Sequence, residues 1–279
     1  MRVDVGGRVL TLSNLDKVLY PRTGTTKAEV LDYYARVAPR ILPQLRERAV
    51  TRVRWPDGVS GQSFFEKNVP SHAPSWLRTV QVGRTRFPLI DDVAGLTWMA
   101  NSAALELHSH QWRVAADGTP DAADRLVVDL DPGEPAGLPE CAQVALAVRT
   151  LVGGLGLEAY PVASGSKGMH LYVPLPTPVP DPSGVARQIA EQITAALPAL
   201  VVTSMAKQRR SGKVFFDWSQ NNASKTTVTP WSLRGRDRPM VAMPLTWDEV
   251  EAGAEDPLAI EQVSLAEALR RLDQAPEVP

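Results

Sequence analysis

Cysteine is nearly absent from this chain, and so is any long hydrophobic run. Cys141 is the only cysteine among 279 residues, which excludes a disulfide framework and a thiolate-rich metal site and is typical of a reducing compartment. The opening MRVDVGGRVLTLSNL lacks the apolar core of a signal peptide. No apolar run reaches the ~20 residues that a membrane span needs. These absences predict a soluble, intracellular protein without a membrane partner.

An excess charge of one sign is also missing, because the formal net charge is −1. The distribution is nevertheless uneven. Between Ser204 and Thr246 eight basic residues face two acidic ones, whereas from Asp248 onward nine acidic residues face two arginines. The basic segment predicts a local anion-binding face, although an ordinary solvated surface would explain it as well.

The hydrophobic fraction of 44% is sufficient for a substantial core, in one large domain or in two lobes. In the first half, the patterns predict strands at 50–55, 63–67, 85–90 and 105–112. Thr26 and Glu29 have the spacing of a capping box for a helix that continues past Ile41, and Asp92 can cap a second helix through Ala104. This half therefore has a mixed α/β pattern.

The second half alternates in a more regular way. Strands are expected at 125–130, 158–164, 169–175 and 213–218, and helices at 141–152 and 184–197. The order β-α-β-β-α-β is that of the ferredoxin-like or split βαβ unit. In that unit the first and last strands are neighbours, and the third strand lies on the other side of the first. The predicted fold class is α/β in the broad sense, or α+β.

Two aspartates stand two residues apart at the end of the apolar strand RLVVDLDP. Asp129 and Asp131 would point to the same face of that strand. Two close carboxylates repel, and burial adds to the cost of ionising both, so a divalent cation would relieve the strain. For the D-x-D motif taken alone, a turn start at D-P-G is the better explanation. Asp217, at the end of the predicted neighbouring strand, favours instead a site for two Mn²⁺ or Mg²⁺ ions about 4 Å apart.

The stretch SGSKGMH, residues 164–170, joins two predicted strands and is rich in small residues. The exposed backbone N–H groups of such a loop can bind an anion, with Lys167 as a point charge for phosphate. Ser164 and His170, at the two ends, could contact phosphate or sugar oxygens. The alternative is an ordinary hairpin with a surface lysine and a satisfied strand histidine.

Two further basic residues follow Asp217 in the basic segment. Lys225 and Arg234 are spaced to reach a triphosphate or backbone phosphates. Near the start of the chain, Lys17 and Lys27 flank the turn YPRTGTT and could hold a phosphate. Isolated lysines of this kind also commonly face solvent.

A pair of adjacent aromatic residues stands on the predicted strand at 63–67. Phe64 and Phe65 point to opposite faces, so one of them turns away from the core. An exposed phenylalanine beside Lys67 suits stacking on a base. A sheet-edge residue covered by a loop is equally compatible with the pattern.

Seven stretches resemble, in the same order, one known family. They are DKVLYPRTGTTK, TRVRWPDG, FFEKN, LELHSHQW, RLVVDLDPG, SGSKGMHLYVPL, and KVFFDWSQN with SKTT and WSLRGR. They are similar to the polymerase domain of bacterial ligase D, in the archaeo-eukaryotic primase superfamily, and extend from about residue 10 to about residue 250.

The resemblance implies a primase-like fold with an RRM-like catalytic core. It implies a single primase-polymerase domain over residues 1–279. Within it, residues 1–113 would form an N-terminal α/β lobe for DNA 5′-phosphate and template contacts. Residues 114–279 would form the catalytic lobe with C-terminal helices.

The resemblance also implies a nucleotidyltransferase of bacterial non-homologous end joining. Such domains prefer ribonucleotides, use Mn²⁺, fill gaps and add untemplated nucleotides. The expected ligands are NTP or dNTP and DNA ends that are gapped or 3′-protruding and carry a 5′-phosphate. Ku and a separate or fused DNA ligase are expected partners, in the bacterial cytoplasm at the nucleoid.

Position by position, the resemblance assigns roles to individual residues. Asp129, Asp131 and Asp217 correspond to the catalytic, metal-binding carboxylates. Residues around the incoming nucleotide correspond to His108, Ser164, Ser166, Lys167, Gly168, His170, Lys225 and Arg234. The DNA-binding set corresponds to Lys17, Lys27, Phe64, Phe65 and Lys67, with the first two at the 5′-phosphate and the aromatic pair near the template base.

The chain also departs from the wider family. It lacks the K-x-D-G motif of a ligase module, so we expect a standalone homologue or an excised domain. One cysteine and four scattered histidines argue against the zinc site of replicative primases, and synthesis without a primer is not expected. Two other functions remain compatible with the residues: a non-catalytic RRM-like nucleic-acid-binding module, and a two-metal phosphodiesterase or nuclease.

Overall fold

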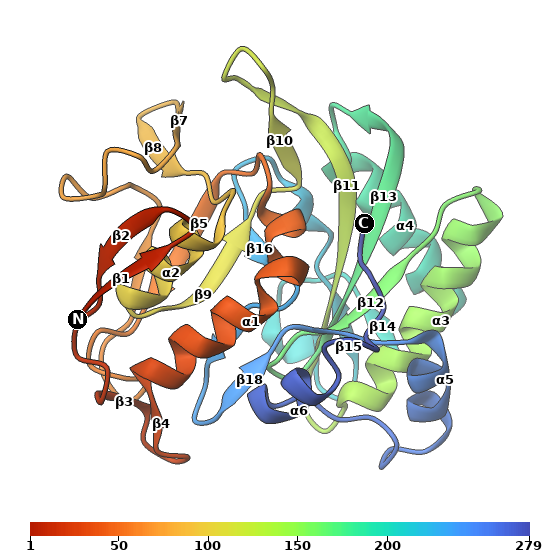
Figure 1. The fold of residues 1–279 in the computed structure, drawn as a ribbon. Helices are drawn as coiled ribbons and strands as arrows, with labels where there is room; N and C mark the ends of the chain where they lie inside the picture. The colour runs from red at the N-terminus through yellow and green to blue at the C-terminus, as the bar shows by residue number, and fades with distance from the viewer.

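Two larger β-sheets and the helices around them carry the fold. A computed structural model describes residues 1–279, with every side chain except that of Lys207. Figure 1 shows the N-terminal third on one side of the molecule, the long strands β11 (Pro120–Pro132) and β13 (Met169–Val179) in the middle, and several helices on the other side. None of the described helices combines the length and the apolar character needed to cross a bilayer.

The larger sheet is built from the apolar segments of the second half. Its other strands are β10 (Trp112–Val114), β12 (Tyr160–Ala163), β14 (Val201–Val202), β15 (Val214–Phe216) and β19 (Met243–Pro244). The order is β14-β15-β11-β13-β12-β19, and β10 pairs with β11 away from this path. The predicted neighbours are confirmed, since β11 lies between β15 and β13 and pairs antiparallel with both.

Alternation along β11 divides its side chains between two faces. Leu126, Val128 and Leu130 belong to the main core, which also contains the inner faces of α3 (Leu138–Gly154) and α4 (Pro182–Ala196). Val127 points the other way, into a second cluster with Tyr172. Because Asp129 and Asp131 share the parity of Val127, the carboxylates lie on the sheet face opposite the helices.

The smaller sheet joins the two halves of the chain. Its order is β16-β9-β5-β6, with β5 (Val50–Arg54), β6 (Phe64–Glu66), β9 (Ala104–Ser109) and β16 (Thr227–Val228). β16 comes from the basic segment, and its Val228 packs in the same cluster as Val127 of β11. The N-terminal sheet therefore stands against the carboxylate face of the larger sheet. The division into lobes at residue 113 stays a prediction.

Helix α1 (Lys27–Leu45) links the smaller sheet to the second half of the chain by polar contacts. Thr26 and Glu29 form the predicted capping box at its start. Tyr33 and Tyr34, on the buried face, donate hydrogen bonds to the carbonyl oxygens of Trp231 (2.8 Å) and Leu105 (2.6 Å). These two bonds connect α1 to the smaller sheet and to the basic segment.

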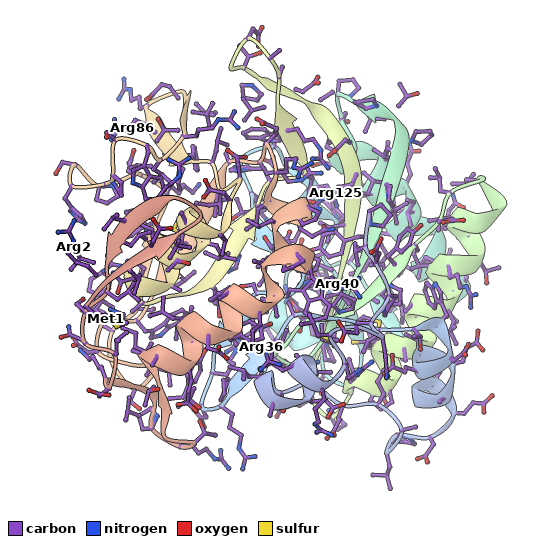
Figure 2. All side chains as sticks on the ribbon, in the orientation of Figure 1. Met1, Arg2, Arg36, Arg40, Arg86 and Arg125 are labelled. Carbon is purple, nitrogen blue, oxygen red and sulfur yellow. The ribbon has the colours of Figure 1, made fainter. Side chains whose placement is uncertain are left out.

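A buried arginine also fastens α1 to the larger sheet. Arg125 of β11 is only 2% exposed and donates to Gln44 of α1, Gln111 and Ser109. In Figure 2, Arg125 and Arg40 lie beside α1, whereas Arg86 and Arg2 lie at the edge of the molecule. Arg40 donates to two carbonyl oxygens near the C-terminus, those of residues 272 and 275.

Several predicted boundaries differ from those of the structure, and two of the differences have a clear physical reason. The helix capped by Asp92, α2 (Val93–Asn101), ends before Ala104 because Ala103 has a φ of +58° and turns the chain into β9. The strand predicted at 105–112 is interrupted after Ser109. There, the backbone leaves the smaller sheet, and β10 begins at Trp112 to pair with β11.

Short elements complete the structure. They are β1 (Arg2–Val5), β2 (Arg8–Thr11), β3 (Val18–Tyr20), β4 (Thr25–Thr26), β7 (Thr79–Val82), β8 (Thr85–Pro88), η1 (Lys207–Arg209), η2 (Trp218–Asn221), β17 (Leu233–Gly235), β18 (Pro239–Val241), α5 (Trp247–Glu255) and α6 (Leu265–Arg270). Of these, β17, β18 and the segment between α5 and α6 border the site described next.

Candidate active site

Three side chains form a row across the middle of the larger sheet. In the register of β11 and β13, Asp129 is opposite His170, and the Asp129 Oδ1 to His170 Nε2 distance is 3.3 Å. On the other flank, Asp217 directly follows β15, and its backbone N–H donates to the carbonyl of Asp129 at 2.9 Å. The pairing therefore brings together Asp129, Asp131 and Asp217, as the strand order predicted, with His170 beside them.

Asp131 shows the electrostatic cost of this arrangement. Burial against the surrounding protein raises the pKa of its carboxyl group, and the neighbouring charges of Asp129 and Asp217 raise it further. His170 and Lys167 act in the opposite direction but do not cancel the effect. By surface area the Asp131 residue is nevertheless exposed to solvent, whereas Asp129 is only 8% exposed. The protein alone leaves part of the negative charge of these carboxylates uncompensated. A cation bound at this position would therefore be stabilised.

Asp129 and Asp131 line a cavity of about 380 Å³ between the two sheets, whereas Asp217 is not part of its lining. Eight of the residues predicted from sequence line it, and all eight are polar; of the other predicted nucleotide residues, Gly168 and Lys225 are not in the lining. The lining contains His108, Asp129, Asp131, Ser164, Ser166, Lys167, His170, Gln220, Thr226, Thr227, Val228, Arg234 and Arg236. The lining combines acidic with basic groups, which suits a ligand that carries both metal ions and phosphates.

The loop 164–168 is folded back on itself at the rim of this cavity. The backbone N–H of Ser164 donates to Gly168 O at 3.0 Å, and the Ser164 hydroxyl accepts from the N–H groups of Ser166 and Gly168. Gly168 has no room for a side chain, because a Cβ would stand 2.0 Å from the carbonyl oxygen of Leu130. The predicted anion-binding loop is thus a compact hairpin turn with Lys167 at its tip.

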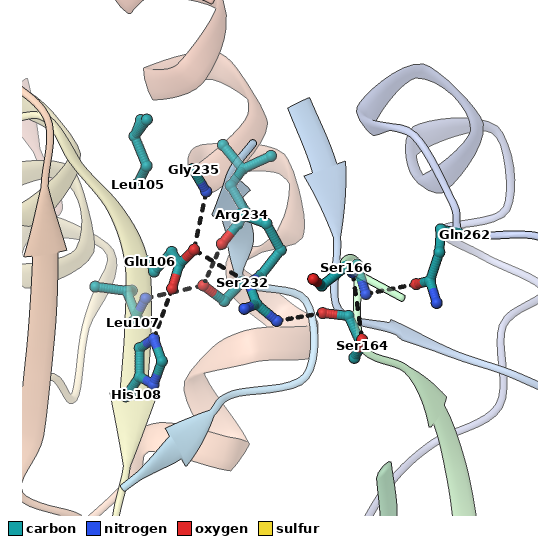
Figure 3. A network of polar contacts seen from close by, with 12 residues as sticks. Leu105, Glu106, Leu107, His108, Ser164, Ser166, Ser232, Arg234, Gly235 and Gln262 are labelled. Atoms are coloured by element: carbon teal, nitrogen blue, oxygen red, sulfur yellow. Dashed lines mark hydrogen bonds and ion pairs between the residues drawn. The ribbon is translucent and has the colours of Figure 1, made fainter. Parts of the chain in front are cut away.

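A buried carboxylate, Glu106, holds the opposite wall (Figure 3). One oxygen accepts from Arg234 Nε at 3.1 Å and from the N–H of Gly235 at 2.9 Å, and the other lies 2.8 Å from His108 Nε2. Burial acts to raise the pKa of Glu106, but the hydrogen bond with His108 and the charge of Arg234 outweigh it and hold the pKa at about 2. Because an ionised carboxylate only accepts, Nε2 of His108 carries the hydrogen.

Asp217 is held by its own local contacts. It accepts hydrogen bonds from the N–H and hydroxyl of Ser219 and from Gln220, and Lys225 Nζ lies 4.0 Å from its Oδ2. Among the described residues, no three His, Cys, Asp or Glu side chains converge as a metal-ligand group. The carboxylates repel one another, which favours keeping them apart. Asp129 and Asp217 each have a protein donor or cation nearby.

The donor set nevertheless fits divalent cations of the hard type. The three aspartates supply carboxylate oxygens, the ligands that Mg²⁺ and Mn²⁺ prefer. Asp129 and Asp131 are on β11, Asp217 directly follows the paired strand β15, and the pKa of Asp131 is raised by burial and by the charges of the other two. Asp129, Asp131 and Asp217 are therefore the residues that would hold such ions. In addition, Nδ1 of His170 is buried and has no hydrogen-bond partner among the described residues.

The residues predicted to contact DNA lie outside the cavity, on the N-terminal side. Phe64 and Phe65 are both exposed, at 41% and 59%, although only one was expected to turn outward. Phe65 approaches the ring of His108 edge-on, with 6.3 Å between centroids. Lys67 reaches the carbonyl of Ser224 at 3.5 Å. An apolar platform thus borders the entrance beside His108.

Lys17 and Lys27 are neighbours in space. The N–H of Lys27 donates to the carbonyl of Lys17 at 2.8 Å. Lys17 forms an ion pair with Asp57 (2.8 Å), while Lys27 Nζ donates to Ser13 O (2.6 Å). Burial lowers the pKa of Lys27, and the charge of Lys17 lowers it further. Two adjacent lysines with partly uncompensated charge favour an anion between them.

A larger hollow, of about 1010 Å³, lies elsewhere, between α3, β12 and α5. Its walls include Leu146, Leu157 and Trp247, and it contains none of the three aspartates. The smaller cavity is the better candidate for chemistry, because charged groups from four strands and one loop converge there.

Sequence reasoning missed several residues of the site. Glu106 stands two positions before His108 on the same strand, so the alternation rule applied to Asp129 and Asp131 would have placed it beside His108. Gln220, Thr226 and Arg236 also line the cavity and carry no pattern that marks them.

Comparison with known proteins identifies what the chain is similar to. The family model "LigD, primase-polymerase domain" matches residues 26–277. The chain is 51% identical over 269 residues to the multifunctional non-homologous end joining protein LigD of Mycolicibacterium smegmatis, covering 94% of the chain and 34% of that protein. It is 33% identical to the bifunctional LigD of Bacillus subtilis, covering 87% of the chain and 40% of that protein. The chain thus spans between a third and two fifths of the length of these relatives.

A solved structure is similar over nearly the whole chain. The polymerase domain of Mycobacterium tuberculosis ligase D, determined in complex with DNA, superposes with a TM-score of 0.91 at 48% identity. The match covers 96% of each chain. The expected α+β, primase-like fold class is confirmed by this likeness.

Proposed function

The chain belongs to the LigD primase-polymerase family, and from that premise we propose that it is a DNA-dependent nucleotidyltransferase acting at double-strand breaks in bacterial non-homologous end joining. The observation that carries the proposal is the row of Asp129, His170 and Asp217, with Asp131, beside a cavity that Lys167 and Arg234 also line. Carboxylates for metal ions and cations for a triphosphate are the two requirements of nucleotidyl transfer.

The chemistry is the attack of a DNA 3′-hydroxyl on the α-phosphorus of a nucleotide, with pyrophosphate as the leaving group. When bound by the three aspartates, two Mn²⁺ or Mg²⁺ ions supply a lowered pKa for the 3′-hydroxyl and neutralise charge on the phosphates. Lys167, at the tip of the loop 164–168, orients the triphosphate, and Arg234 adds a fixed charge. Lys225 offsets the charge of Asp217, which it approaches to 4.0 Å.

Residues on the rim select and hold the substrates. His108 is fixed by Glu106 with hydrogen on Nε2, so its other nitrogen is free to accept from a sugar hydroxyl. This contact supports a preference for ribonucleotides, whose 2′-hydroxyl is a donor. Phe64 and Phe65 stack near the template base, Lys67 contacts the backbone, and Lys17 with Lys27 holds a 5′-phosphate across a gap.

Partners and location follow from the family. NTPs and dNTPs are the proposed substrates, on gapped or 3′-protruding ends. Ku and a DNA ligase, fused or separate, would complete end joining in the bacterial cytoplasm at the nucleoid. The known complex of the mycobacterial polymerase domain with DNA supports DNA as the first of these partners.

Replacing one metal ligand tests the proposal. Asp129→Asn should lower Mn²⁺-dependent primer extension at least about 100-fold, because one ligand charge is lost. Its melting temperature without added cation should stay equal or rise, since the change removes repulsion with Asp131. Asp121→Asn is the matched control, on the same strand but exposed and outside the cavity.

The outcome with labelled primer also separates the rival functions. Primer, Mn²⁺ and the wild-type protein are incubated with and without NTPs. Extension supports the polymerase, shortening of the primer indicates a nuclease, and binding without product indicates a non-catalytic module. Full extension by the Asp129→Asn variant would contradict the proposed metal site.

A further inference from the structure

A glutamine from outside both sheets spans the loop 164–168. Oε1 of Gln262 accepts from the N–H of Gly165 at 2.7 Å, and Figure 3 shows Gln262 turned toward this loop. Its Nε2 donates to the carbonyl of Gly168 at 2.8 Å. The loop thus presents one donor and one acceptor to the same side chain. A neutral amide satisfies both at once, which a carboxylate or an ammonium group cannot do.

The segment that carries Gln262 is itself anchored. The N–H of Val241 in β18 donates to the carbonyl of Val263 at 2.9 Å, and Met240 forms an isolated bridge with Ser264. On the other side Ile260 packs against Gly253 of α5 so closely that a Cβ on that glycine would stand 2.4 Å away. Gln262 therefore starts from backbone held on both flanks.

The loop also fits tightly on Arg234. A Cβ at Gly165, where φ is +68°, would stand 2.6 Å from Cγ of Arg234. Arg234 Nη1 donates to the carbonyl of Ser164, while its Nε is held by Glu106. A shift of the loop would therefore disturb the guanidinium on which the proposed triphosphate contact depends.

We infer that Gln262 is a positioning residue, which holds the loop 164–168 in the shape that binds the nucleotide triphosphate. This inference rests on the proposed function. Gln262 is not in the cavity lining and touches no substrate; it acts through Gly165 and Gly168. The C-terminal segment between α5 and α6 is thereby part of the nucleotide site.

Kinetics with a length-matched apolar variant test the inference. Gln262→Met removes both hydrogen bonds and keeps the length of the side chain. The KM for NTP, measured with primer-template DNA and Mn²⁺, should rise about tenfold, the effect of two lost hydrogen bonds. The kcat should change less than about twofold, because the loop contacts the triphosphate in the ground state and the transition state alike.

The control is the same change at a distant glutamine. Gln143 on α3 also donates from Nε2 to a backbone carbonyl, that of Ala254, at 3.4 Å. Gln143→Met should leave the KM for NTP and the affinity for DNA unchanged. Equal KM values for the Gln262→Met variant and wild type, or equal losses in both variants, would overturn the inference.

Amide hydrogen exchange gives a readout that needs no polymerase activity. In the wild-type protein the Gly165 amide should exchange slowly, because Gln262 accepts from it. In Gln262→Met it should exchange at least about tenfold faster, while amides of β13 keep their protection. Fast exchange at Gly165 in the wild type would contradict the inference. If the wild type does not extend primers, the proposed function fails, and this measurement still decides the role of Gln262.

Discussion

At the residue scale, Glu106 shows how one buried charge can organise a site. Its side chain is 9% exposed, and it serves Arg234, Gly235 and His108 at the same time. A carboxylate is required because all three partners donate. Removing this ion pair from water costs free energy, but the carboxylate of Glu106 accepts three contacts that offset the cost. Glu106 therefore stays charged in the interior.

We expect Glu106→Gln to damage both stability and nucleotide use. The change removes the negative charge opposite Arg234. The NH2 group of the new amide would also face one of the three groups that now donate to the carboxylate, and two donors cannot bond to each other. The free energy of unfolding should fall by about 3 kcal/mol, measured by urea denaturation, and the KM for NTP should rise. The control, Glu158→Gln, changes an exposed carboxylate that accepts from Tyr160. Wild-type values in the Glu106→Gln variant would show that the network has no role.

At the element scale, the turn between β12 and β13 depends on close approach of backbones. Gly168 stands against the carbonyl oxygen of Leu130, at the point where β11 carries Asp129 and Asp131. The same contact places the loop 164–168 beside the carboxylates. The geometry of this loop is therefore coupled to the pairing of the two central strands.

Gly168→Ala should separate β11 from the turn. A Cβ at 2.0 Å from Leu130 O cannot be accommodated without a backbone shift, and we expect a loss of about 1–3 kcal/mol in unfolding free energy together with reduced primer extension. Gly153→Ala in α3 is the opposite case, because nothing lies within 4 Å of its Cβ position. That variant should be neutral or gain up to about 1 kcal/mol from helix propensity. Equal melting temperatures for the two variants would refute the argument.

At the scale of the whole molecule, a satellite core stabilises the N-terminal side. It contains Phe87 and Trp112, and His110 packs between their rings with centroid distances of 5.3 and 4.4 Å. Nδ1 of His110 lies 2.9 Å from Ala49 O. Burial lowers the pKa of His110 from 6.5 to about 4, although the contact with Ala49 acts to raise it. The folded protein therefore keeps this imidazole neutral.

Stability should accordingly fall with acid in a defined window. The unfolded chain binds a proton at His110 below pH 6.5, while the folded protein does so only near pH 4. Stability from the neutral imidazole is complete above pH 6.5 and is lost as pH falls toward 4, by roughly 3 kcal/mol. Urea unfolding of His110→Asn should show a shallower decline between pH 7 and 4.5 than wild type. His72→Asn, at an exposed histidine, should match the wild-type slope. If His110→Asn also shows the wild-type slope, the loss of stability in acid does not come from His110.

Much of the architecture was predictable because short-range patterns encode it. The alternation in RLVVDLD predicted that Asp129 and Asp131 share a face, and the β-α-β-β-α-β order predicted that Asp217 would approach them. The capping box at Thr26 marked the start of α1. Where a local pattern competed with a turn, as at Ala103, the prediction was wrong, since a positive φ in a non-glycine residue leaves no mark in the pattern.

By itself, the sequence determined the strand order, the placement of the three aspartates and the family. These depend on periodicity and on motifs that are contiguous in the chain. Only the tertiary structure decided which distant groups support them: Arg234 meets Glu106 across 128 residues, and Gly165 meets Gln262 across 97. The physical reason is that a hydrogen bond between separate segments depends on how sheets and loops pack, and packing is a property of the whole fold rather than of any window of sequence.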